Sequence, residues 1–187
     1  GGTSAYYYIW SDADGTEHAF FPIEGSSTEY EDEDGLQLKL TVSSSTCTIK
    51  DDNKTVKTFT KMSSTPGSDV YGAWYLSSIS DKNNNTISFT FDNMRPTQVN
   101  LTPNGSSTIT FLTIAYNSSN MPYVIWNSST KEAIIFRYSS TATGSITTTD
   151  TKYLREVIYA RGSSSVSSSN WLDFYNNSSN TTNITVD

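Results

Sequence analysis

The sequence is short of several residue types, and each shortage excludes a class of protein. A single cysteine, Cys47, in 187 residues excludes a fold held together by intramolecular disulfide bonds. Only 12 Lys and Arg stand against 19 Asp and Glu, and the net charge of −7 argues against nucleic acid and against an anionic membrane surface as partners. No run of about 18 apolar residues occurs, so we expect no membrane insertion through a spanning helix.

Good helix formers are also scarce, whereas the residues of strands and turns are abundant. Ser, Thr and Asn make up about two-fifths of the chain, far above their usual share. Aromatic residues reach 13%, with 12 Tyr, 8 Phe and 4 Trp. Aromatic and β-branched residues favour strands, and Ser, Asn, Asp and Gly favour turns. The composition therefore predicts an all-β protein with little or no helix.

Apolar and polar residues alternate along the chain, and turn sequences separate the alternating stretches. Strand-like segments such as 36–42 and 86–91 are flanked by turns such as 12–15, Asp-Ala-Asp-Gly, and 81–85. This arrangement predicts antiparallel hairpins that build a curved sheet, an open barrel or a sandwich. We predict that one sheet face is filled by Leu36, Leu38, Leu40, Ile79, Ile87, Phe89, Phe91, Ile114, Ile125, Ile134 and Phe136.

The middle and the C-terminal part of the chain call for further predictions. A loop at 63–68, rich in Ser and Pro-Gly, predicts a boundary between an N-terminal hairpin region, 1–62, and a second hairpin region, 63–187, with one continuous domain as the alternative. We expect a short strand around Ile146. The stretch 153–159 fits a strand better than a helix, and we predict another short strand at 171–175.

One hairpin unit recurs, and its best copy spans residues 75–92. Leu76, Ile79 and Asp81 precede the turn, and Phe89 and Phe91 follow it. This copy resembles the YD repeat of Rhs proteins, whose loose form is Leu-x-x-Ile-x-Asp-x-x-Gly-x-x-x-x-Phe-x-Tyr-Asp. Asn is present in this chain where the repeat usually has its turn Gly.

The resemblance extends over most of the chain to about Gly162, with looser copies such as 123–138. It implies a spiralling antiparallel ribbon in a bacterial protein that is secreted or displayed on the cell surface. In the family, such ribbons form shells around toxin cargo or extended adhesion surfaces. This chain lacks the family's long run of regular repeats, so we do not expect a closed shell from these residues. We expect a non-enzymatic structural or adhesive module whose partners are other domains of a larger surface protein.

An acidic turn is the one candidate for metal binding. Asp12, Asp14 and Glu17 are spaced like the start of a calcium loop. The remaining ligands of a twelve-residue loop are missing, and the Asp-Gly pair is equally typical of a hairpin turn. We predict no cofactor, with calcium at these three residues as the alternative.

The residues that catalysis would need are few. His18 is the only histidine, and no Gly-x-Ser-x-Gly sequence accompanies it, so we expect His18 to make cross-strand structural contacts. Glu132 and Glu156 are the carboxylates that fall on predicted strands, but nothing in the sequence connects them. Cys47 lies in a strand-like stretch and is expected to be a small buried residue.

The aromatic residues support an alternative function. Trp74, Tyr75 and Trp126 are candidate platforms for sugar rings, which would make the chain a carbohydrate-binding module with a glycan as partner. The competing interpretation is that thin β-ribbons fill their cores with large aromatic side chains.

Overall fold

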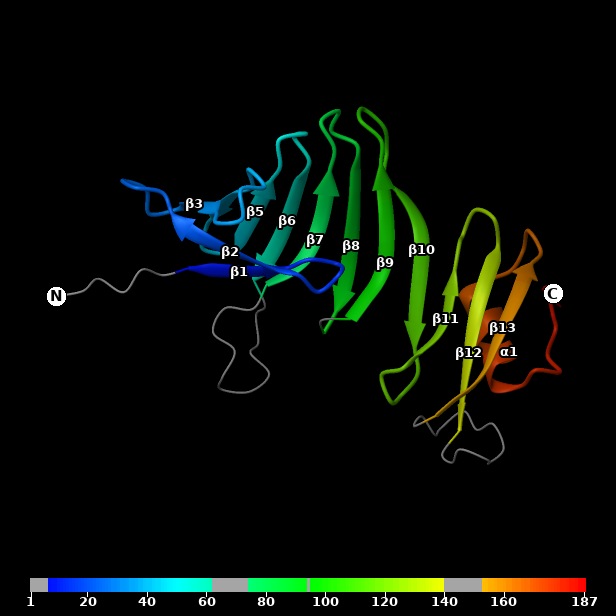
Figure 1. Ribbon diagram of the computed structural model, residues 1–187. Coiled ribbons are helices and arrows are strands. Elements are labelled where there is room, and N and C mark those ends of the chain that lie inside the picture. The colour runs from blue at the N-terminus through cyan, green and yellow to red at the C-terminus, as the bar shows by residue number, and fades with distance from the viewer. Residues whose placement is uncertain (1–6, 62–73, 94, 140–152) are drawn as a thin grey trace. The chain divides into compact units, whose positions relative to one another are not determined.

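The computed structural model describes residues 7–61, 74–93, 95–139 and 153–187, which form antiparallel strands and one short helix (Figure 1). The strands are β1 (Tyr8–Ser11), β2 (Glu17–Pro22), β3 (Glu29–Asp32), β4 (Lys39–Val42), β5 (Thr46–Lys50), β6 (Val56–Lys61), β7 (Trp74–Ser80), β8 (Thr86–Asp92), β9 (Arg95–Thr102), β10 (Ile109–Tyr116), β11 (Pro122–Trp126), β12 (Glu132–Ser139), β13 (Tyr153–Gly162) and β14 (Ile184–Val186). Each strand pairs with the next in the chain, so the strands form one open sheet in the order β1 to β14. The predicted all-β, antiparallel fold is confirmed.

The chain divides into two compact units. The N-terminal unit comprises 1–89 and 101–108, and the C-terminal unit comprises 90–100 and 109–187. The boundary predicted at residues 62 and 63, and the strand predicted around Ile146, lie outside the described residues. Each unit contains its own hydrophobic core, and the two cores are built differently.

The core of the N-terminal unit is made by strands and the loop before β4. Its buried members are Phe20, Tyr30, Leu38, Leu40, Cys47 and Ile49. Tyr8 and Trp10 of β1 and Trp74 of β7 pack against the same cluster. Strands from the beginning and the end of this unit therefore contribute to one core.

The core of the C-terminal unit combines strands with the helix α1 (Ser168–Asn176). Trp171, Phe174 and Tyr175 of α1 are buried in one cluster with residues of β11, β12 and β13. Figure 1 shows α1 next to these strands. A bulge in β11, opposite Ala115 and Tyr116, interrupts the alternation of the strand. As a result, the neighbouring residues Tyr123 and Val124 both belong to the cluster that α1 covers.

The strand predicted at 171–175 is wrong, because these residues lie in α1. Trp171, Phe174 and Tyr175 are spaced three and four residues apart, which places them on one face of a helix. The Asn170 side chain accepts a hydrogen bond of 2.9 Å from the backbone N–H of Ser167, the residue before the helix. The aromatic content suggested a strand, but the spacing and the Ser-rich start specify a helix. The strand predicted at 153–159 is confirmed, and a further short strand is formed by Ile184–Val186.

The predicted core is correct for two leucines and wrong in three other places. Leu38 and Leu40 are buried, as expected. Leu36, in the same loop as Leu38, is 51% exposed. Ile87 of β8 is 40% exposed.

In β12 the prediction chose the wrong face. Ala133 and Ile135 are buried, whereas Ile134 and Phe136 are only partly buried. Both faces of this strand carry apolar residues, so alternation alone cannot identify the inner one. The inner face is the one that carries Ala133 and Ile135, because α1 packs against these two residues.

Candidate functional site

Four hairpin turns share one hydrogen-bond pattern. They begin at Asp12, Asp51, Asp81 and Asn117. In each turn, a side-chain oxygen of the first residue accepts the backbone N–H four residues later, at 2.8 to 3.0 Å. The backbone N–H of the first residue donates to the carbonyl of that same later residue. The side chain thus closes the turn that its own backbone begins.

The fourth residue of each of these turns has a left-handed backbone. These residues are Gly15 (φ 80°), Lys54 (63°), Asn84 (63°) and Asn120 (66°). Each donates its N–H to the carbonyl of the first turn residue. Gly and Asn adopt this conformation readily, whereas Lys does so with strain. The sequence signal for the turn is therefore Asp or Asn followed three residues later by Gly or Asn, and Lys54 is the exception.

The turn of the best YD-like copy is further stabilised by its side chains. Asp81 Oδ2 accepts a hydrogen bond of 2.8 Å from the Asn85 side-chain amide. This bond, together with the backbone amides of Asn85 and Asn83, lowers the pKa of Asp81. Asn85, which stands where the repeat has Gly, has no positive φ; the left-handed residue is Asn84.

The three candidate metal ligands do not converge. Asp12 Oδ1 accepts the backbone N–H groups of Asp14 and Thr16, both at 2.9 Å. Asp14 and Glu17 are exposed. In the described part of the chain, no group of three or more His, Cys, Asp or Glu side chains is placed to hold a metal ion. Asp12 serves as the cap of a hairpin turn.

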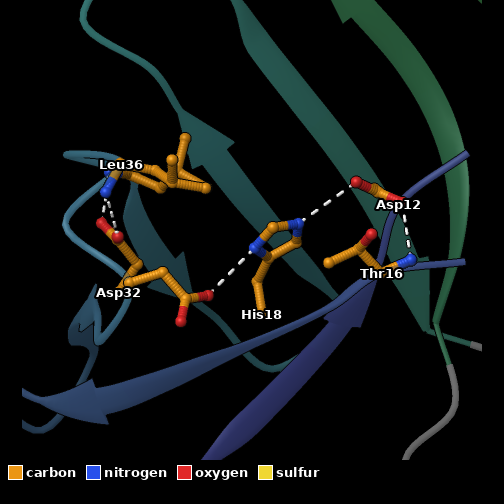
Figure 2. A network of polar contacts seen from close by, with 7 residues as sticks. Asp12, Thr16, His18, Asp32 and Leu36 are labelled. Carbon is orange, nitrogen blue, oxygen red and sulfur yellow. Dashed lines mark hydrogen bonds and ion pairs between the residues drawn. The ribbon is translucent and has the colours of Figure 1, made fainter. Parts of the chain in front are cut away.

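Two carboxylates from different segments of the chain meet at His18. Figure 2 shows the imidazole between the β1–β2 turn and the loop that precedes β4. Its Nε2 lies 3.2 Å from Asp12 Oδ2, and its Nδ1 lies 3.1 Å from Asp34 Oδ2. His18 is only 7% exposed. The expected cross-strand structural contacts of His18 are present, and the two carboxylates are contacts that the sequence did not indicate.

The surroundings of His18 favour its protonated form. The hydrogen bonds to Asp12 and then to Asp34 raise its pKa against the opposing effect of desolvation. The hydrogen bond from His18 in turn lowers the pKa of Asp12. The Trp10 ring stacks on the imidazole at 5.0 Å, and Lys57 of β6 lies 4.5 Å from the centre of the Trp10 ring.

Of the three candidate sugar platforms, Trp74 and Trp126 pack against different cores. Trp74 is partly buried against the core of the N-terminal unit, and Lys61 lies 5.9 Å from its ring. Tyr75, next to it in β7, is also partly buried. Trp126 is partly buried against the core of the C-terminal unit. Burial of these rings agrees with core filling, whereas a sugar platform needs an open face.

The strand carboxylates singled out in the sequence lie opposite arginines of the neighbouring strand. Glu132 is 3.0 Å from Arg161, and Glu156 is 3.4 Å from the buried Arg137. These contacts give both carboxylates a structural partner. Cys47 is buried, as expected, and burial raises the pKa of its thiol to about 11.

An open polar groove lies between two turns of the N-terminal unit. It is lined by Asp52, Asn53, Lys54, Thr55, Asp81, Lys82 and Asn83. The groove separates two copies of the shared turn, which begin at Asp51 and Asp81. Its lining is polar and contains no aromatic ring that could stack on a sugar.

The sequence matches no protein-family model and no curated protein. The described residues contain no helix with the length and hydrophobicity needed to cross a lipid bilayer.

Proposed function

We propose that this chain is a non-enzymatic structural or adhesive module of a larger bacterial protein that is secreted or displayed on the cell surface. The observation that carries the proposal is the recurrence of one turn. The turns that begin at Asp12, Asp51, Asp81 and Asn117 have the same hydrogen bonds and the same left-handed position. Repetition of one hairpin device along a sheet of sequential neighbours is typical of repeat proteins, which use extended surfaces rather than a single pocket.

The use of the polar side chains supports the same function. Asp12, Asp81 and Asn117 accept backbone N–H groups within their own turns. Glu132 and Glu156 contact arginines across a strand pair. The structural contacts of these five side chains support a non-enzymatic module. The resemblance to YD repeats adds the surface context and the other domains of the larger protein as partners.

Binding and turnover assays test this function. The untagged protein is applied to immobilised matrix proteins, mucins and glycans, and the same panel is assayed for hydrolysis. An adhesive module binds one of these surfaces saturably and leaves it chemically intact. A structural module binds none of them and has no activity. Hydrolysis that follows the protein through purification and disappears in a His18→Gln variant that still folds would contradict both.

A carbohydrate-binding module is the second candidate, and an exposed aromatic pair favours it. Tyr7 is 58% exposed and Phe21 is 39% exposed, and their rings stack at 6.2 Å. Glu31 lies beside Phe21 in the β2–β3 pairing and is exposed, so a carboxylate is available to accept hydroxyl hydrogen bonds. Aromatic faces flanked by such acceptors suit pyranose rings.

A glycan array separates the two candidates. The wild type is compared with Trp74→Ala, which tests the platform expected from the sequence, and with Phe21→Ser, which tests the exposed pair. Loss of a glycan signal in either variant, with folding intact, supports the carbohydrate-binding function. A signal that neither substitution changes, or the absence of any glycan signal, leaves the structural or adhesive function.

A further inference from the structure

His18 occupies a position that its neutral form cannot satisfy. An ionised carboxylate only accepts hydrogen bonds, and a neutral imidazole has a single N–H. Here both ring nitrogens face carboxylate oxygens, Nε2 that of Asp12 at 3.2 Å and Nδ1 that of Asp34 at 3.1 Å. In either neutral tautomer, one nitrogen lone pair would therefore point at a carboxylate. Only the imidazolium donates to both.

We propose that His18 is a proton-dependent latch, which ties the β1–β2 turn to the loop before β4 when the imidazole is protonated and releases one of them when it is neutral. The two connected segments are distinct elements. Asp12 begins the β1–β2 turn, and Asp34 lies in the loop 33–38 between β3 and β4. Because His18 is 7% exposed, water can replace a lost carboxylate contact only if one segment moves away.

The groups packed around the imidazole define the charge balance of the latch. Asp12 and Asp34 favour the protonated form. Lys57 of β6 lies 4.5 Å from the centre of the Trp10 ring, and the imidazole stacks on the same ring at 5.0 Å. Two carboxylates within hydrogen-bond distance of the imidazole outweigh one cation whose contact is with the Trp10 ring, because charge interactions weaken with distance.

The direction of the pH dependence follows from this balance. The folded-state pKa of His18 is raised above the ordinary value of about 6.5 that it has in the unfolded chain. The latch therefore stabilises the N-terminal unit fully below about pH 6.5, and this contribution is lost as the pH rises through the raised pKa. At the acid end, the contribution of Asp12 is lost as the pH falls through its lowered folded-state pKa.

A nuclear magnetic resonance titration tests the latch directly. His18 is the only histidine, so imidazole ¹⁵N signals of the untagged protein are unambiguous and report the proton on each nitrogen. We expect both nitrogens to be protonated at pH values well below 6.5, and the titration midpoint to lie above 6.5. A midpoint at or below about 6.5 would overturn the proposal.

Two substitutions test whether Asp34 causes the raised titration midpoint of His18. Asp34→Asn removes a charge but keeps the side-chain shape, and the 49% exposed Asp34 side chain makes the change mild for folding. We expect this variant to lower the midpoint of His18. Asp81→Asn alters an equivalent turn cap that has no histidine, and it should leave the midpoint unchanged. Equal midpoints in the wild type and Asp34→Asn would overturn the latch.

Hydrogen exchange tests the release. The amide of Thr16, bonded to Asp12, is compared with the amide of Asn85, bonded in the same way to Asp81. After correction for intrinsic exchange, protection of Thr16 or of Glu33, which donates to Ala19, should fall above the midpoint of His18, while protection of Asn85 stays constant. Parallel changes at all three amides would contradict a local latch.

Calcium provides the last control, because Asp12 belongs to the acidic turn considered as a metal site. The titration is repeated with calcium chloride and with EDTA. Identical midpoints support Asp12 as a partner of His18 alone. A midpoint that falls in calcium would show that a metal ion competes for Asp12, and the latch assignment would then fail.

Discussion

The N-terminal unit buries its apolar face with strands and one loop, whereas the C-terminal unit buries its face under a helix. In the first, Tyr8 and Trp10 of β1 and Trp74 of β7 pack against the same cluster. In the second, Trp171, Phe174 and Tyr175 of α1 supply the large side chains. A sheet with one apolar face needs a second layer, and this chain obtains that layer in two ways.

The polar groups of the two units differ in a related manner. The N-terminal unit holds its turns and loops with carboxylates, and the imidazole of His18 joins two of them. The C-terminal unit uses the neutral Asn117 in the same kind of turn, and its buried cation, Arg137, donates to the carbonyl of Tyr175 in the last turn of α1. We therefore expect pH to affect mainly the stability of the N-terminal unit. Loss of helix contacts should affect mainly the stability of the C-terminal unit.

The largest expected effect comes from Trp171→Ala. The Trp171 side chain is fully buried, so its removal should reduce the free energy of unfolding of the C-terminal unit by about 4–5 kcal/mol. Hydrogen exchange should show the loss in β11 to β13. Leu172→Ala is the control on the same helix, because Leu172 is 41% exposed. Similar losses in the two variants would mean that α1 is not a required layer.

Phe20→Ala removes a fully buried aromatic side chain from the N-terminal unit. It should reduce the free energy of unfolding of this unit by about 3–4 kcal/mol. Cys47 provides the readout, because it is buried in the same cluster and its thiol pKa is about 11. Labelling of Cys47 at neutral pH should be slow in the wild type and much faster in Phe20→Ala. The neighbouring Phe21→Ala, at a 39% exposed position, should label slowly. Fast labelling of Cys47 in Trp171→Ala would show that the two cores are not independent.

Asn117→Ala tests the shared turn at a neutral side chain. The variant loses hydrogen bonds to the amides of Ser119 and Met121, which should reduce the free energy of unfolding by about 1–2 kcal/mol. Denaturant unfolding measures the change. Asn117→Asp keeps the accepting oxygen and should restore most of the loss, and Ser118→Ala should have little effect. No rescue by Asp would show that the amide group, rather than the turn oxygen, matters here.

The smallest expected effects are gains from Lys54→Gly and Lys131→Gly. Both lysines have φ of 63°, one in each unit. Glycine removes the strain of this conformation, which should raise the free energy of unfolding by about 0.5–1 kcal/mol. Thermal unfolding of each variant gives the gain. Lys82→Gly, at a turn position without positive φ, should be neutral or destabilising. A gain in only one unit would show that the turn strain depends on the core beneath it.

Much of the fold could be predicted from the sequence because its signals are local. The turn at 81–85 and the strand at 86–91 follow from Asp, Asn and alternating apolar residues within a few positions. The same kind of reasoning failed for α1, where aromatic content was weighed above the three- and four-residue spacing of Trp171, Phe174 and Tyr175. It also failed in β12, whose two faces are both apolar.

The candidate site was less predictable, because its members are distant in the sequence. Nothing local joins His18 to Asp34, sixteen residues away. Their contact depends on the pairing of β2 with β3, which brings the loop before β4 near the β1–β2 turn. Only Asp12, at the start of the predicted turn, had been singled out, and it was considered for calcium rather than for an imidazole.

By itself, the amino-acid sequence determined the strand-and-turn character of this protein, because turn propensity and alternation act over a few residues. It also determined the acidic charge and the buried state of Cys47. Tertiary structure alone decided which face of β12 is inner, because the decision depends on where α1 packs. It also decided that the one histidine lies between two carboxylates, because the pairing of β2 with β3 brings Asp34 to a histidine that the β1–β2 hairpin places beside Asp12.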